Sequence, residues 1–168
     1  YGYSDTVTGA TAVLNAGTVY RAVGECQKSA ALYERAEKIY EKELASEDDR
    51  LGGLYNNYAS TLTELGEFEK ALEKYNKALK IMSAAPNGKL EAAITYLNMA
   101  DLYVKKLGVI ESETITDELL EKAYTLLTDD SIEKNAYYEF VLDKCIPAYD
   151  QFGQFLRSNE LKRRINRL

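Results

Sequence analysis

Apolar and small residues recur along this chain three and four positions apart, the spacing that places side chains on one face of an α-helix. In the segment 55–62, for example, a tyrosine, an alanine and a leucine occupy the first, fifth and eighth positions. Glycine, proline and groups of Asp, Asn and Ser separate such segments, and these residues favour turns and helix caps. The pattern predicts an all-α chain with helices at about 7–23, 27–45, 50–65, 68–84, 89–106, 115–128, 132–151 and 156–167.

The helical pattern repeats at a long, nearly constant period. Residues 13–20 correspond to residues 55–62, displaced by 42 positions, and to residues 96–103, displaced by a further 41. In each copy a small residue precedes a large one by three places, which lets a neighbouring helix approach closely and fills the space beside it. A glycine that can end the helix follows each large residue, at Gly24, Gly66 and Gly108. A fixed period of this length is typical of a repeat protein.

A second helix is expected after each of these glycines. Small, aromatic and small residues recur there at positions i, i+4 and i+7, first as Ser29, Tyr33 and Ala36 and then as Ala71, Tyr75 and Ala78. The third copy keeps only Leu120 and Ala123 of this pattern, after a short insertion at 111–114 that predicts a longer hairpin loop. We expect the large residues of both helices to be largely buried, namely Tyr20, Tyr33, Leu62, Tyr75 and Tyr103.

This order of small, large, glycine, small, aromatic and small residues resembles the tetratricopeptide repeat. Residues 17, 20, 24, 29, 33 and 36 match it, and so do residues 59, 62, 66, 71, 75 and 78. The long period and the segment Leu54–Ala59 are similar to kinesin light chain repeats. The bulky first-helix residue of the family corresponds to Val13, Tyr55, Tyr96 and Tyr137.

The resemblance implies a right-handed superhelical stack of about four antiparallel helix pairs, an α-solenoid in one domain that spans residues 1–168. In the last pair Lys144 stands where Tyr20 and Tyr103 stood, and Pro147 is expected to kink its helix. We also expect the chain to be part of a longer protein. The resemblance implies three repeats and a degenerate capping pair, at about 10–50, 51–88, 89–130 and 131–168.

Charge and hydropathy exclude several kinds of partner. The formal net charge is −6 and no basic cluster occurs before residue 162, so we expect no nucleic-acid partner. No apolar run approaches the roughly 20 residues that a membrane span needs, and the chain does not open with a secretion signal. We therefore expect no membrane partner and a cytoplasmic location.

The residue inventory also bears on chemistry. The chain has no histidine, and Cys26 and Cys145 lie far apart, outside any Cys-x-x-Cys pair. Acid pairs such as Asp129 with Asp130 are the only candidates for catalysis, and carboxylates at helix starts are expected as caps. We predict no metal ion, no cofactor and no catalytic residue, and we do not expect an enzyme.

The resemblance implies that the first helices line a concave face, where partners bind. Small polar residues lie beside the core stripe on that face, and an asparagine recurs at one place in each copy. A carboxamide has both a donor and an acceptor, so these asparagines can bond the backbone of an extended peptide, or equally a neighbouring helix. The predicted peptide-binding residues are Asn15, Thr18, Asn56, Asn57, Ser60, Glu64, Asn98, Asp101 and Lys105.

Two functional hypotheses follow from these observations. The first is an interaction scaffold that holds a protein or an extended peptide segment in the concave groove. The second is a peptide-sensing regulatory domain of a larger signalling protein, which a DNA-binding segment elsewhere in that protein would indicate. The sequence leaves a homo-oligomer open and does not identify the partner.

Overall fold

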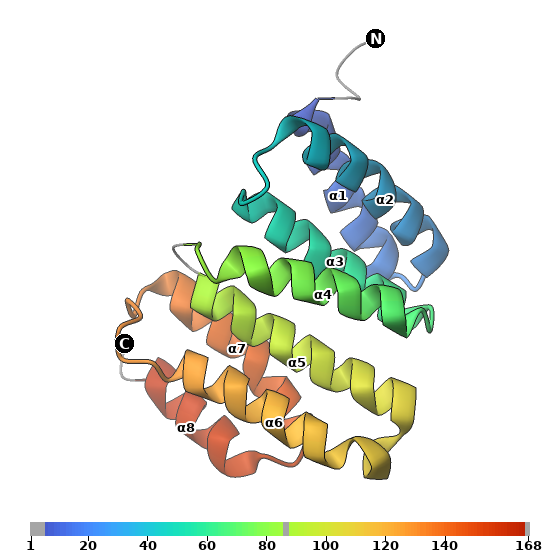
Figure 1. Ribbon diagram of the computed structural model, residues 1–168. Coiled ribbons are helices and arrows are strands. Elements are labelled where there is room, and N and C mark those ends of the chain that lie inside the picture. Colours follow the sequence, from blue (N-terminus) through green and yellow to red (C-terminus); the bar gives the residue numbers. More distant parts are fainter. Residues whose placement is uncertain (1–5, 86–87, 167–168) are drawn as a thin grey trace. The chain divides into compact units, whose positions relative to one another are not determined.

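The computed structural model describes residues 6–85 and 88–166, and every regular element in these ranges is a helix (Figure 1). The helices follow one another as antiparallel pairs, which confirms the predicted all-α class. The helices are α1 (Val7–Ala22), α2 (Cys26–Glu43), α3 (Asp49–Glu64), α4 (Phe68–Met82), α5 (Gly88–Leu107), α6 (Val109–Leu127), α7 (Ala136–Gln151) and α8 (Phe155–Ile165).

The chain divides into two compact units, one within Tyr1–Gly88 and the other within Lys89–Leu168. Helices α1 to α4 build the first unit, and helices α5 to α8 build the second. The second unit has a core that gathers buried side chains from all four of its helices, such as Leu97, Leu120, Leu142 and Leu161. Each unit thus consists of two helix pairs packed on each other.

A glycine with a positive φ lies in the turn inside each of the four pairs. Gly24 has φ 80° and Gly66 has φ 76°, a conformation that only glycine adopts without strain. The next residue bonds back across each turn, from Glu25 N to Tyr20 O at 2.9 Å and from Glu67 N to Leu62 O at 2.9 Å. The predicted role of these two glycines as helix ends is therefore confirmed.

The second helix of each pair in the first unit packs its aromatic residue against the first helix. Tyr33 and Tyr75 are almost completely buried, together with the small residues on either side of them. A Cβ atom built on Gly17 would lie 3.2 Å from the Tyr33 ring, so the small residue of α1 is small because this ring covers it. The prediction that Tyr33, Leu62 and Tyr75 are core residues is confirmed.

The same prediction is wrong for Tyr20 and incomplete for Tyr103. Tyr20 is 39% exposed, and Tyr103 is only half-buried. Both lie one turn from the end of their helix, at the place that Leu62 occupies in α3. Leu62 is only 3% exposed there, so the place itself can be buried and the exposure of Tyr20 depends on its local surroundings. The ammonium of Lys28 lies 5.7 Å from the centroid of the Tyr20 ring.

The predicted longer loop in the third pair is also wrong. Helix α6 begins at Val109, directly after Gly108, so residues 111–114 lengthen the helix. Gly108 has φ 89° and serves as the N-cap, as Glu67 does for α4. Counting from this cap, buried Ser112 takes the first small position and buried Thr116 takes the aromatic position. Because Thr116 is not aromatic, the sequence pattern could not reveal the correct register.

The fourth pair lies five residues later than a fixed period predicts. Gly153, with φ 72°, forms the turn, and Gln154 N bonds to Tyr149 O at 2.8 Å. Tyr149 is therefore the equivalent of Tyr20 and Leu62, and this assignment corrects the one that placed Lys144 there. By the same count Leu142, not Tyr137, is the bulky first-helix residue. The connection between α6 and α7 is longer than the others, which displaces the fourth copy.

Two further features of α7 follow from its true start. The helix begins at Ala136 behind the N-cap Asn135, whose side chain accepts bonds from Tyr137 N and Tyr138 N, so the start predicted at residue 132 was too early. Pro147 lies inside the helix on its exposed side, and the helix continues to Gln151.

Candidate functional site

The structural register identifies one equivalent face on all four first helices. Each first helix has one residue that lies ten positions before the N-cap of the second helix of its pair. These four residues are Asn15, Asn57, Asn98 and Lys144. We call the residues on this side of α1, α3, α5 and α7 the first-helix face. None of them is buried: Thr11, Asn15, Thr18 and Ala22 on α1, Gly53, Asn57, Ser60 and Glu64 on α3, Ile94, Asn98, Asp101 and Lys105 on α5, and Phe140, Lys144, Pro147 and Gln151 on α7.

In the first unit, two predicted site residues of this face also hold their helix pairs together. The hydroxyl of Thr18 lies 2.8 Å from the Tyr33 hydroxyl, and the hydroxyl of Ser60 lies 3.1 Å from the Tyr75 hydroxyl. Each therefore joins the first helix to the second at the same register. Both hydroxyls are therefore already hydrogen-bonded to tyrosine in the absence of a ligand.

The other predicted residues of the first unit differ in their access to solvent. Asn15 and Glu64 are exposed and Asn57 is half-buried, so all three can meet a ligand. Asn56 is only 7% exposed and lies inside the helix packing. Although Asn56 directly precedes Asn57, the helical rotation of one residue turns its side chain away from the first-helix face.

In the second unit, the first-helix faces of α5 and α7 border a cleft of about 270 Å³. The cleft brings the predicted residues Asn98 and Asp101 together with residues of α7 that the sequence did not indicate. Lys105, one turn beyond Asp101, forms an ion pair with it at 3.0 Å. The residues that line the cleft are Ile94, Leu97, Asn98, Asp101, Lys144, Cys145, Ala148, Gln151 and Phe152.

The lining of the α5–α7 cleft combines an apolar surface with a few polar groups. Leu97 and Phe152 belong to or pack against the hydrophobic core and supply apolar wall. Asn98 and Gln151 offer side-chain amides, each with a donor and an acceptor. The ammonium of Lys144 lies 4.7 Å from the centroid of the Phe140 ring, one turn earlier on α7. Such a surface can receive an apolar side chain and bond the polypeptide backbone next to it.

The cysteine thiol that lines the cleft is not reactive. Cys145 lines it but is 1% exposed, and burial raises the pKa of its thiol to about 12. The thiol therefore stays protonated at neutral pH and is a poor nucleophile. Within residues 6–85 and 88–166, no group of three or more His, Cys, Asp or Glu side chains could hold a metal ion. No helix of these residues is long and apolar enough to cross a membrane.

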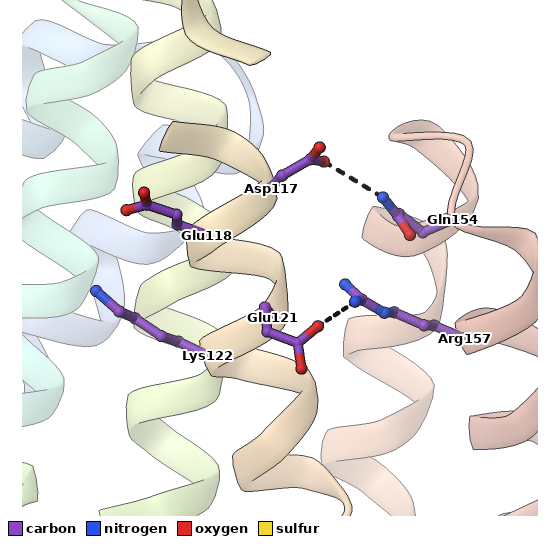
Figure 2. Close-up of a pocket in the computed structure, with 6 residues that line it drawn as sticks. All are labelled: Asp117, Glu118, Glu121, Lys122, Gln154 and Arg157. Atoms are coloured by element: carbon purple, nitrogen blue, oxygen red, sulfur yellow. Dashed lines mark hydrogen bonds and ion pairs between the residues drawn. The ribbon is translucent and has the colours of Figure 1, made fainter. Parts of the chain in front are cut away.

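A second cleft, of about 510 Å³, lies between the second helices α6 and α8 (Figure 2). Two contacts bridge it: Gln154 Nε2 donates to Asp117 Oδ1 at 3.3 Å, and Arg157 forms an ion pair with Glu121. Glu118 and Lys122 of α6 complete the lining. The sequence prediction missed this cleft, although the run of acidic residues from Glu111 to Glu121 marks one of its walls.

Comparison with known proteins supports the resemblance that the sequence suggested. Residues 50–108 match the tetratricopeptide repeat family. The structure is similar to the crystal structure of BtubC (BKLC) from P. vanneervenii, with a TM-score of 0.61 and 22% sequence identity over 95% of this chain. It is also similar to a protein of Podospora anserina assigned as a kinesin light chain with nearly identical TPR-like repeats, with a TM-score of 0.58 and 19% identity over 97% of this chain.

These similarities show tetratricopeptide repeats within residues 50–108 and a fold shared with the two similar structures. The chain spans 62% of the length of BtubC and 76% of the length of the Podospora protein. No curated protein matches the chain. Tetratricopeptide domains typically serve as protein-interaction scaffolds.

Proposed function

We propose that this tetratricopeptide-repeat chain is a protein-interaction scaffold whose first-helix face holds an extended peptide segment of a partner protein. The observation that carries the proposal is the α5–α7 cleft, because it joins the predicted residues Asn98 and Asp101 to a second wall on α7. An apolar pocket with a few convergent polar groups is the usual form of a binding site.

The lining of the cleft supports one way of holding a peptide. An apolar side chain of the peptide enters between Ile94 and Ala148, where it is removed from water. The amides of Asn98 and Gln151 then bond the peptide backbone on either side. Each such bond contributes about 0.5–1.5 kcal/mol, so the apolar contact must supply most of the roughly 8 kcal/mol that micromolar affinity represents.

In the first unit, Asn15 and Asn57 occupy the register of Asn98 and are accessible to solvent. We infer that they form a binding face of the first unit, together with Thr18, Ser60 and Glu64. Thr18 and Ser60 already bond to tyrosine hydroxyls, so they contribute shape and spare acceptor capacity. Asn56 is left out because it is buried.

The probes for this proposal are peptides that are selected from a displayed random library because they bind the whole chain. The selected peptides are then titrated by calorimetry against the wild type and two cleft variants. Ala148→Arg places a large charged side chain in the cleft and should abolish binding. Asn98→Ala removes one amide and should weaken binding about tenfold, which is a step of about 1.4 kcal/mol.

Glu133→Ala is the matched control, because Glu133 is exposed in the connection before α7 and does not line the cleft. It should bind the selected peptides like the wild type. Thermal melts of each variant separate lost binding from lost folding. Selected peptides that bind Ala148→Arg as tightly as the wild type would contradict the proposal.

A further inference from the structure

Both second helices of the second unit begin with two exposed apolar side chains. Val109 and Ile110 open α6 and are 73% and 82% exposed, and Phe155 and Leu156 open α8 and are 60% and 88% exposed. In the first unit the second residue of each equivalent helix is polar, namely Gln27 in α2 and Glu69 in α4. Burying a side chain of this size is worth about 1.5–3 kcal/mol, so the repeated exposure indicates a contact surface.

The two doublets flank the α6–α8 cleft along the chain, and we call the doublets and the cleft residues together the α6–α8 strip. Gln154, the residue before Phe155, bonds to Asp117 of α6, and one turn further Arg157 pairs with Glu121 (Figure 2). Asp117 lies seven residues after Ile110 on the same helix, which is two turns or about 10 Å. The strip thus has an apolar end at the start of α6 and another beside Asp117, at the start of α8.

Acidic residues follow the α6 side of this strip, from Glu111 beside the first apolar end to Glu121 beyond the second. From Val109 to Glu121, helix α6 has five carboxylates and no lysine or arginine. Figure 2 shows Asp117, Glu118 and Glu121 around the α6–α8 cleft, where Glu121 is engaged by Arg157. Gln154 donates a single bond to Asp117 and leaves its charge uncompensated. The three carboxylates outnumber the two cations that line the cleft, Lys122 and Arg157, so the cleft can accept positive charge from outside.

We propose that the α6–α8 strip binds a basic amphipathic helix of a partner protein. Two apolar residues seven positions apart on such a helix are about 10 Å apart and reach Ile110 and Leu156. Lysines or arginines at the third and fourth positions lie between these two ends and meet the carboxylates of Glu113 and Asp117. This surface is separate from the first-helix face and does not depend on the function proposed for that face.

Charge complementarity favours a basic helix over two other partners, a second copy of this chain and a membrane surface. A symmetric contact between two copies would bring the acidic strip of one against the acidic strip of the other, which costs free energy. The anionic surface of a membrane would repel the same carboxylates. A basic helix satisfies both the apolar ends and the carboxylates of α6.

The test uses a panel of synthetic helical peptides with Leu, Ile or Phe at positions i and i+7 and lysine at i+3 and i+4. A matched panel has glutamate in place of lysine, and a third has the same residues in scrambled order. Binding to the whole chain is measured by fluorescence anisotropy. We expect members of the lysine panel alone to bind, with affinity that falls as salt is added.

Two variants locate the binding surface on the chain. Leu156→Ser should weaken binding about tenfold, and Glu113→Lys should weaken it at least as much and reduce its salt dependence. Val23→Ser is the matched control, because it removes an exposed apolar residue after α1, outside both the strip and the first-helix face, and should leave this binding unchanged. All three residues are exposed, so the variants should fold, and thermal melts check that they do.

Several results would overturn the proposal. Equal binding of the lysine, glutamate and scrambled panels would show that the strip has no charge preference, and no binding by any lysine peptide would exclude the basic helix. Self-association in analytical ultracentrifugation that is lost in Leu156→Ser would assign the strip to a second copy of the chain. Binding to anionic phosphatidylserine vesicles that is lost in the same variant would assign it to a membrane.

Discussion

The ring of Tyr75 is 1% exposed between α3 and α4, and its hydroxyl lies 3.1 Å from Ser60 Oγ. Tyr75→Ala leaves a large cavity, while the Ser60 hydroxyl keeps its bond to Asn56 O, so we expect a loss of about 3–5 kcal/mol in the free energy of unfolding. Urea unfolding followed by circular dichroism measures this loss. A loss below about 1 kcal/mol would show that Tyr75 does not have the core role assigned to it.

Tyr20 offers the matched comparison, because it is the same residue type in a more open place. It is 39% exposed, and the ammonium of Lys28 lies over its ring. Tyr20→Ala should therefore cost about 1 kcal/mol or less in the same experiment. The difference between the two variants measures burial rather than the chemistry of tyrosine.

The two cysteines should differ in reactivity. Burial raises the pKa of Cys145 to about 12, so at pH 8 almost none of this buried thiol is the reactive thiolate. Cys26, at the start of α2, is partly exposed. We expect a thiol reagent at pH 8 to modify one cysteine per native chain, Cys26, and both in urea. Equal rates at both sites in the native protein, resolved by mass spectrometry, would contradict the burial of Cys145.

A largely buried ion pair connects helices α2 and α4 of the first unit. Lys74 of α4 pairs with Glu37 of α2, and its ammonium lies 5.6 Å and 5.5 Å from the ring centroids of Tyr55 and Tyr58 on α3. Lys74→Met leaves the carboxylate of Glu37 buried without its cation, which should cost about 3–5 kcal/mol.

The double variant Lys74→Met with Glu37→Leu distinguishes this explanation from simple loss of packing. Replacing both partners by apolar residues removes the unpaired charge, so much of the lost stability should return. Urea unfolding of the two single variants and the double variant gives the coupling energy. Losses that simply add would mean that the two side chains do not interact.

Most helices were predictable because their signals are local. The i, i+3, i+4 spacing of apolar residues and the positive φ of Gly24 and Gly66 depend on a few neighbouring residues, and the structure places both turns where the sequence did. The fourth copy was misplaced because the connection before α7 is longer than the others. Nothing in a fixed period reveals the length of a connection, which depends on how distant helices pack.

The candidate site was predictable only on its α5 side. Asn98 and Asp101 could be identified because they repeat the register of earlier copies, and both line the α5–α7 cleft. Lys144 and Gln151 could not, since their register depends on the displaced turn at Gly153. Likewise, the burial of Asn56 next to accessible Asn57 depends on packing between helices, which neighbouring residues in the sequence do not determine.

At the scale of the molecule, the second unit presents two clefts that share no lining residue, one between α5 and α7 and one between α6 and α8. The α5–α7 cleft has mixed charge, because Asp101 pairs with Lys105. The acidic residues of the α6–α8 strip, in contrast, have the same sign as the net charge of the whole chain, which is −6. Long-range attraction by the whole molecule therefore favours a basic partner at the strip over a neutral peptide at the other cleft.

We predict that the two ligands bind at the same time and respond differently to salt. Saturating the α5–α7 cleft with its selected peptide should change the Kd of the basic helix by less than about twofold, since no residue is shared and a coupling free energy of about 1 kcal/mol or more is needed for a clear effect. Raising the salt concentration from about 50 mM to about 500 mM should weaken the basic helix strongly and an uncharged cleft peptide little, because screening acts on exposed charges. Anisotropy titrations with two differently labelled peptides measure both effects, and Ala148→Arg and Leu156→Ser identify which site each peptide occupies. Mutual displacement of the two peptides would mean that they compete for one surface, and an equal response to salt would mean that charge does not distinguish the two sites.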